Sequence, residues 1–151
     1  MQSYNGYSGE LRAKAQRWLN MMVASKMLVR SRYCCACAGG GIIDFHAEDY
    51  SEPFTLEKTA AFPLCFSCHM AVHNRFRNPS SWDKYRGMVE GGRRFPEFYT
   101  RDFGTFIYRF TRMHATLTSD WIVPYNAPPK MPDALDVIDG WLLANTGTGW
   151  R

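Results

Sequence analysis

The sequence predicts an α+β fold in which a strand–loop–strand–helix segment lies between helices. Apolar residues in the first thirty positions recur at helical spacing, two short apolar runs near 42–45 and 62–64 are typical of strands, and residues 65–76 contain neither glycine nor proline. A chain of 151 residues has the size of one domain. We therefore expect a single domain over 1–151, with an N-terminal helix in 1–30, a central module at 33–78 and a helical and irregular extension at 79–151.

The first predicted helix begins after Ser8, whose hydroxyl can cap its free amide groups. Its apolar face is expected to pack on the core and consists of Leu11, Ala15, Trp18, Leu19, Met22, Val23 and Met27.

The central segment is predicted to run as strand, loop, strand and helix. Three glycines at 39–41 precede a short strand over 42–45, which delivers His46 at its end. A turn at 51–53 leads to a return strand over 62–64, and a helix follows until Asn78 and Pro79.

Three further helices are expected after this segment. The first begins at Pro79 and is closed by Gly91 and Gly92, and the second carries an apolar stripe over 103–110. Asp133 is suited to cap a short last helix that includes Trp141 and Leu142.

No segment has the character of a signal peptide or of a span of about 18 apolar residues, so the expected location is cytoplasmic. Reducing compartments keep thiols free. Five cysteines at short gaps therefore fit metal binding better than a disulfide framework.

Four of these cysteines form two pairs, each with two residues between the thiols: Cys34 with Cys37, and Cys65 with Cys68. Two such pairs complete a tetrahedral four-thiolate Zn²⁺ site, which is closed to substrate and stabilises the fold. Cys35 is the remaining thiol, either a neighbour of the site or a substitute for Cys34.

Three histidines adjoin the cysteine pairs. His69 and His73 are four residues apart on the predicted helix, so their imidazoles share one face and can bind one ion. His46 comes from the preceding strand, and Asp49 can add an oxygen ligand or orient an imidazole. The alternative is that the helix histidines only pack beside the cysteine site.

The run from Cys34 to His73 resembles the zinc-containing HNH endonucleases of phages and other mobile elements, which have a ββα-metal fold. The resemblance covers about forty of the 151 residues. It implies that the four paired cysteines hold structural zinc and that His69 and His73 hold a catalytic Mg²⁺ or Mn²⁺. It also implies that His46 and Asp49 belong to the catalytic machinery.

One position departs from the pattern of that family, because Ala47 stands where many members have a second histidine that acts as the general base. If His46 is a metal ligand, Glu48 or Asp49 must replace the base. If His46 is the base, the cation is held by His69 and His73, with or without Asp49.

Basic residues flank the central loop. Residues 1–37 and 67–113 each carry a net charge of +5, whereas residues 38–66 carry −4 with histidines neutral. Guanidinium groups pair with phosphate, and the candidates for nucleic-acid contact are Arg75, Arg77, Arg93 and Arg94.

We therefore expect a metal-dependent endonuclease that acts on DNA or structured nucleic acid. The alternative is a catalytically silent zinc module that binds nucleic acid or blocks a partner protein, and Ala47 favours it. A structural zinc protein with no role in nucleic-acid binding is the third hypothesis.

Overall fold

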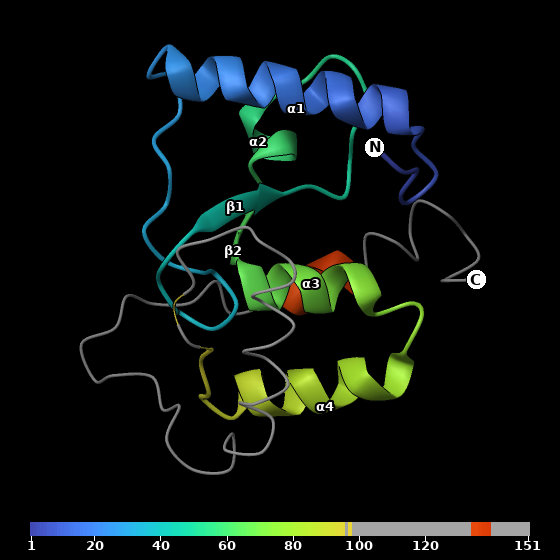
Figure 1. Ribbon diagram of the computed structural model, residues 1–151, viewed down its shortest axis with the longest axis vertical. Coiled ribbons are helices and arrows are strands. Elements are labelled where there is room, and N and C mark those ends of the chain that lie inside the picture. The colour runs from blue at the N-terminus through green and yellow to red at the C-terminus, as the bar shows by residue number, and fades with distance from the viewer. Residues whose placement is uncertain (96, 98–133, 140–151) are drawn as a thin grey trace. The chain divides into compact units, whose positions relative to one another are not determined.

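The computed structural model describes residues 1–95, 97 and 134–139 (Figure 1). Its elements follow the predicted α+β order, and the fold class is confirmed. They are α1 (Gly9–Ala24), β1 (Ile43–His46), α2 (Leu56–Thr59), β2 (Phe62–Cys65), α3 (Phe66–Asn74) and α4 (Pro79–Glu90). Residues 134–139 are also helical, where the short last helix was expected. The helix predicted over 103–110, Trp141 and Leu142 lie outside the described residues.

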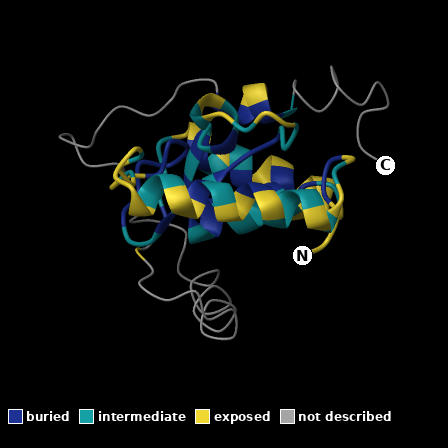
Figure 2. Cartoon of the chain, turned by 90° about the horizontal axis from the view of Figure 1, so that it is seen from above, coloured by how far each residue is buried: buried dark blue, intermediate teal, exposed yellow. Residues whose placement is uncertain are grey.

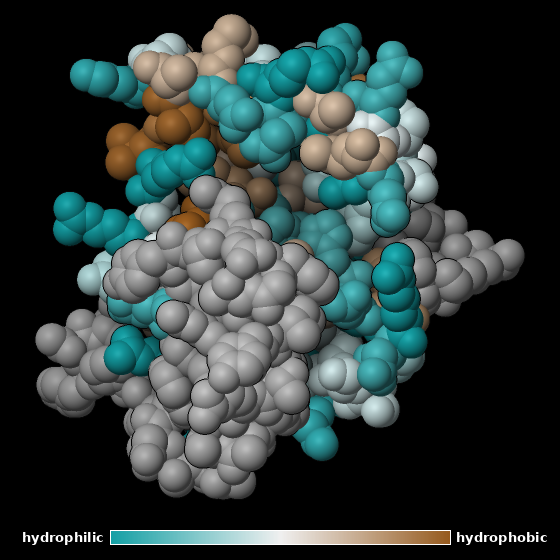
Figure 3. Space-filling view, in the orientation of Figure 1, coloured by the Kyte–Doolittle hydropathy of each residue, from teal (hydrophilic) through white to brown (hydrophobic). Residues whose placement is uncertain are grey.

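Helix α1 begins as predicted, because the Ser8 hydroxyl accepts a hydrogen bond from the amide of Leu11 at 3.2 Å. It ends at Ala24, earlier than the apolar pattern suggested, and Lys26 adopts a left-handed φ of 63°. Buried and exposed residues alternate along it (Figure 2). Apolar side chains gather at the surface beyond its end, where Met27 and Val29 are exposed (Figure 3).

The two strands pair as an antiparallel hairpin, and β2 runs directly into α3 (Figure 1). Cys65 is both the last residue of β2 and the N-cap of α3. The loop between the strands contains α2, which the sequence analysis missed because it has only four residues. Thr55 caps this short helix by accepting a hydrogen bond from the Lys58 amide at 3.3 Å.

The described residues fall into two compact units, and the boundary runs through both strands. The α1 unit comprises residues 1–31, 45–63 and 134–139, and the cysteine unit comprises residues 32–44, 64–95 and 97. In the α1 unit, α1 packs against α2; in the cysteine unit, α3 packs against α4. The expected single domain and its boundaries at 1–30, 33–78 and 79–151 stay a prediction.

Each unit has its own buried side chains. In the α1 unit these include Ala15, Leu19 and Phe62, and in the cysteine unit they include Leu64 and Val72. Within the described ranges, no helix is both long and apolar enough to cross a bilayer.

Candidate metal centre

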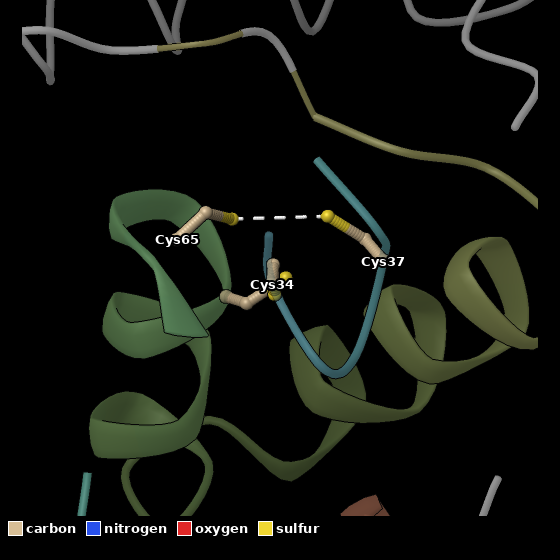
Figure 4. Close-up of side chains that lie close together, drawn as sticks. Cys34, Cys37 and Cys65 are labelled. Atoms are coloured by element: carbon tan, nitrogen blue, oxygen red, sulfur yellow. Dashed lines mark hydrogen bonds between the residues drawn. The ribbon is translucent and has the colours of Figure 1, made fainter. Parts of the chain in front are cut away.

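Four buried cysteines of the cysteine unit converge, as the sequence predicts. The sulfur atoms of Cys34, Cys37, Cys65 and Cys68 all lie within 4.8 Å of one another. Cys37 and Cys65 face each other from the loop and from the start of α3, with their sulfurs 3.8 Å apart (Figure 4). Sulfurs bound at about 2.3 Å around a tetrahedral zinc ion are separated by about 3.8 Å. The cluster therefore has the spacing of a structural zinc site.

The first cysteine pair lies on a tight turn that the backbone builds. The Cys34 amide donates to the Gly39 carbonyl at 2.8 Å, and the Ala38 amide donates to the Cys34 carbonyl at 2.9 Å. The Gly39 amide donates to the sulfur of Cys37 at 3.3 Å. A Cβ atom at Gly39 would lie 3.1 Å from that sulfur and 3.2 Å from the Phe95 carbonyl oxygen, so this position favours glycine.

The second pair lies at the amino end of α3. Cys65 is the N-cap, but its side chain makes no capping hydrogen bond, in contrast to Ser8 in α1 and Asn78 in α4. Cys68 follows in the first turn and is fully buried. The amino end of a helix stabilises negative charge, so this position favours thiolate ligands.

The pKa values of three thiols of the tetrad are strongly shifted by their surroundings. Hydrogen bonds from the Cys34, Cys65 and Cys68 thiols lower the pKa of Cys37 far below its ordinary value. Hydrogen bonding with Cys34 and Cys37 raises the pKa of Cys65, and burial is the largest cause of the raised pKa of Cys68. Without a cation, Cys65 and Cys68 therefore favour the protonated form, and a cation that binds all four sulfurs would displace their protons. Zinc suits such an all-sulfur tetrahedral donor set.

Cys35 lies outside this tetrad. It is nevertheless buried, with an exposed fraction of 8%. Burial, with the charge of the neighbouring Cys34, raises the pKa of its thiol to about 12. Cys35 is therefore a protonated and poorly reactive thiol at neutral pH.

His69 and His73 face each other on α3, which confirms their predicted shared face. Their Nε2 atoms are 3.0 Å apart and their ring centroids 4.7 Å apart, and both residues are half-buried. Two nitrogens bound at about 2.0–2.1 Å in adjacent positions of an octahedral ion are separated by about 2.9 Å. The pair can therefore hold one divalent cation with small adjustment.

His46 is the last residue of β1 and is almost fully buried. Its Nε2 atom lies 2.8 Å from Oε1 of Glu48, and its ring packs edge-on against Tyr4 at 5.7 Å between centroids. All three residues belong to the α1 unit. The predicted meeting of His46 with His69 and His73 joins residues of different units and stays a prediction.

Glu48 does not suit the role of replacement base that the departure at position 47 suggested. Its side chain is buried, and its Oε1 accepts a hydrogen bond from the Tyr4 hydroxyl at 2.8 Å. Nδ2 of Asn5 donates to Oε2 at 2.9 Å and to the Glu48 carbonyl at 2.9 Å. Both carboxylate oxygens thus accept hydrogen bonds inside the protein, so the side chain is poorly placed to take a proton from an attacking water.

Asp49 is half-buried, and its carboxylate also accepts hydrogen bonds within the protein. Its Oδ1 accepts a hydrogen bond from the Tyr7 hydroxyl at 3.0 Å and from the Ser51 amide at 2.8 Å. Burial acts to raise the pKa of Asp49, but the hydrogen bonds from Ser51 and Tyr7 and the charge of Lys58 outweigh it, so the pKa is lowered. Its predicted catalytic role stays a prediction.

A turn at residues 4–7 supplies the donors to Glu48 and Asp49, and the sequence analysis missed it. Tyr4 and Tyr7 exchange backbone hydrogen bonds of 3.0 and 2.9 Å. Asn5 and Gly6 have φ angles of 54° and 83°. An Asn-Gly pair is the usual signature of such a turn, so Tyr-Asn-Gly-Tyr was a usable signal.

Ala47 is buried within the α1 unit, with 3% of its surface exposed. It lines a small cavity together with Ala15, Gln16, Leu19, Phe45, Tyr50 and Thr59. The position that departs from the family pattern therefore faces the side chains of α1.

The four candidate arginines differ in exposure. Arg77 is exposed, and Arg93 and Arg94 are half-buried. Arg75 is 3% exposed, its Nη1 donates to the Val72 carbonyl at 2.9 Å, and its guanidinium lies 3.9 Å from the centroid of the Phe76 ring. Arg75 is thus part of the packed cysteine unit, and its burial argues against the expected contact with phosphate.

The chain matches no family model, no curated protein and no solved structure. The zinc-type cysteine cluster and the adjoining histidine pair therefore stand on their own geometry.

Proposed function

We propose that this chain is a metal-dependent endonuclease of the HNH type, which cleaves phosphodiester bonds in DNA or structured nucleic acid. The observation that carries the proposal is the pair of Nε2 atoms at 3.0 Å, since it provides two ligands for a divalent cation. His69 follows Cys68 directly, so zinc in the cysteine cluster fixes the start of the helix that presents both histidines.

The two metal sites have different roles in this proposal. Zinc on four thiolates has no open position and serves to hold the fold. A Mg²⁺ or Mn²⁺ ion on His69 and His73 would polarise the scissile phosphate and stabilise the leaving oxygen. His46 is proposed to accept the proton of the attacking water. Arg77, Arg93 and Arg94 are proposed to hold the phosphate backbone.

Plasmid nicking tests this proposal directly. The zinc-loaded protein should convert supercoiled DNA to nicked circles with Mg²⁺ or Mn²⁺ and not with a chelator. His73→Ala should abolish the activity because it removes a cation ligand, and His46→Ala should lower it by about 10²–10⁴-fold because it removes general-base assistance. Met70→Ala, on the same helix, is the control. Equal activity of His73→Ala and the wild type would contradict the proposal.

The second candidate is a silent zinc module that binds nucleic acid. Ala47 in place of the family's base favours it, as does the engagement of Glu48 and Asp49 in hydrogen bonds. Such a protein would bind DNA without yielding product under any divalent ion.

Binding to duplex DNA is expected under both candidates, and its affinity should fall steeply as salt rises because phosphate contacts release counterions. Reversal of Arg77, Arg93 and Arg94 to glutamate should abolish it. Reversal of Lys26, an exposed basic residue of the α1 unit, is the matched control. If the wild type fails to bind DNA or RNA at low salt, both candidates fail.

A further inference from the structure

The α1 unit contains a buried carboxylate whose surroundings restrict the chemistry of His46. Glu48 is 2% exposed, and its two oxygens face three side chains: Tyr4 and His46 at Oε1, and Asn5 at Oε2. The three partners come from the turn at 4–7 and from the end of β1, so they reach Glu48 from two parts of the chain.

The orientation of Asn5 follows from its two partners. Its Nδ2 lies 2.9 Å from the Glu48 backbone oxygen and 2.9 Å from Oε2. A carbonyl oxygen can only accept, so the amide nitrogen must face it, and the flipped amide would set two oxygens against each other. Asn5 therefore donates to the carboxylate, which favours its ionised form.

An ionised carboxylate accepts hydrogen bonds and cannot donate them. Nε2 of His46, at 2.8 Å from Oε1, must then carry the proton that joins the two atoms. In a neutral imidazole with a proton on Nε2, the lone pair resides on Nδ1. Any bond from His46 to a cation, or to a proton of water, is then made through Nδ1.

We propose that Glu48, held by Tyr4 and Asn5, is a positioning residue that fixes His46 as the Nε2–H tautomer and so assigns Nδ1 as its reacting nitrogen. As a statement about catalysis the inference rests on the proposed nuclease function. As a statement about the tautomer it depends only on the hydrogen bonds of the α1 unit.

The tautomer is measured in the full-length, zinc-loaded protein with ¹⁵N-labelled histidine, by long-range proton–nitrogen NMR correlations at neutral pH. His46 is assigned by its loss in His46→Ala. The expected pattern has a protonated Nε2 and an unprotonated Nδ1. Protonation of Nδ1, or of both nitrogens, would overturn the inference whether or not the protein cleaves DNA.

The role of Glu48 is tested by Glu48→Gln, which keeps the shape of the side chain. An amide offers both a donor and an acceptor, so His46 should become a mixture of tautomers. If the protein is a nuclease, kcat should fall by about 10–100-fold with unchanged zinc content and DNA affinity. Glu52→Gln, at an exposed glutamate paired with Lys14 at 2.9 Å, should change neither the tautomer of His46 nor kcat. A single Nε2–H tautomer in Glu48→Gln would show that Glu48 does not set it.

A protein with the expected tautomer and no cleavage would retain this assignment and lose the proposed nuclease function. Nuclease activity with a protonated Nδ1 would retain the function and lose the assignment. The two proposals therefore fail separately.

Discussion

Single residues in the segment 46–49 decide what chemistry the α1 unit can perform. His46 and Glu48 are both almost fully removed from water, and each is stabilised there by the other. Removal of one partner of a buried hydrogen bond commonly costs about 1–3 kcal/mol because the other partner loses it. Tyr4 and Asn5 also donate to Glu48, so its carboxylate would keep these two hydrogen bonds if His46 were removed.

Replacement of Ala47 by histidine tests two explanations of the alanine at this position. Either the second histidine of the family pattern is the general base and is missing here, or His46 serves as the base. Because Ala47 is buried and faces a cavity beside Ala15 and Leu19, an imidazole there should overpack the core. We expect a loss of about 1–3 kcal/mol in the free energy of unfolding, measured by denaturant titration, and no gain in cleavage.

Ala47→Leu is the control for that experiment, since it adds bulk without a titratable group. Similar losses of stability in the two variants would support a purely steric effect. A marked rise in cleavage by Ala47→His would mean instead that the missing histidine is the true base.

Asp49 and Tyr7 give the stability of this segment a defined pH dependence. The lowered pKa of Asp49 means that its contribution is present above its unfolded value of about 3.9 and is lost as the pH falls below it. Burial and Asp49 raise the pKa of Tyr7 to about 12, so the contribution of neutral Tyr7 is complete below about pH 10 and is lost between pH 10 and 12.

Denaturant titrations over pH 2–12 check this expectation. Asp49→Asn should reduce the loss of stability on the acid side, and Tyr7→Phe should reduce the loss on the alkaline side. Glu57→Gln, an exposed substitution in α2, should leave both sides unchanged. Identical profiles for wild type and both variants would rule out the Asp49–Tyr7 contribution.

At the scale of elements, the helices begin where polar side chains cap them. Ser8, Thr55 and Asn78 accept hydrogen bonds from amides of the first turns of α1, α2 and α4. Helix α3 begins at Cys65 without such a side-chain bond, because its first turn is part of the cysteine cluster. The start of α3 therefore depends on the cysteine cluster in a way that the other starts do not.

Two glycines of the cysteine unit should respond oppositely to alanine. A methyl group at Gly39 would lie unusually close to the Cys37 sulfur and the Phe95 carbonyl, so Gly39→Ala should shift the turn and weaken zinc binding. Gly87 lies within α4 with no atom within 4 Å of an added Cβ, so Gly87→Ala should stabilise the protein by about 0.5–1 kcal/mol. Competition with a zinc chelator and denaturant titration measure the two effects. Tighter zinc binding by Gly39→Ala would contradict this account of the turn.

The hairpin and α3 also show what local patterns predict well. Short apolar runs located β1 and β2 to within a residue or two, and the histidine spacing located the shared face of α3. The turn at 4–7 was missed because its partners, Glu48 and Asp49, are more than forty positions away and only folding brings them together. The burial of Arg75 was missed for the same reason.

At the scale of the whole molecule, zinc is expected to hold together segments that are distant along the chain. Cys34 and Cys37 lie on the loop before β1, whereas Cys65 is the last residue of β2 and Cys68 lies in the first turn of α3. The free energy of structural zinc binding, about 10–16 kcal/mol in small zinc modules, is as large as the whole stability of a typical domain, about 5–15 kcal/mol.

Purified protein should contain one tightly bound zinc ion per chain, by elemental analysis. Serine at Cys34, Cys37, Cys65 or Cys68 should lower the zinc content and unfold the cysteine unit, because a closed site needs all four sulfurs. Cys35→Ser should keep full zinc content, since this thiol lies outside the tetrad. A zinc-free protein with an unchanged circular dichroism spectrum and melting temperature would refute the zinc assignment.

The sequence by itself determined the α+β order of elements, the two cysteine pairs and the shared face of His69 and His73, because these depend on residue types at short separations. Only the tertiary structure decided that four sulfurs converge at zinc spacing, that Glu48 is buried and accepts hydrogen bonds from Tyr4 and Asn5, and that Ala47 is buried. Burial and long-range hydrogen bonds depend on which distant segments pack together, and no local pattern records that choice.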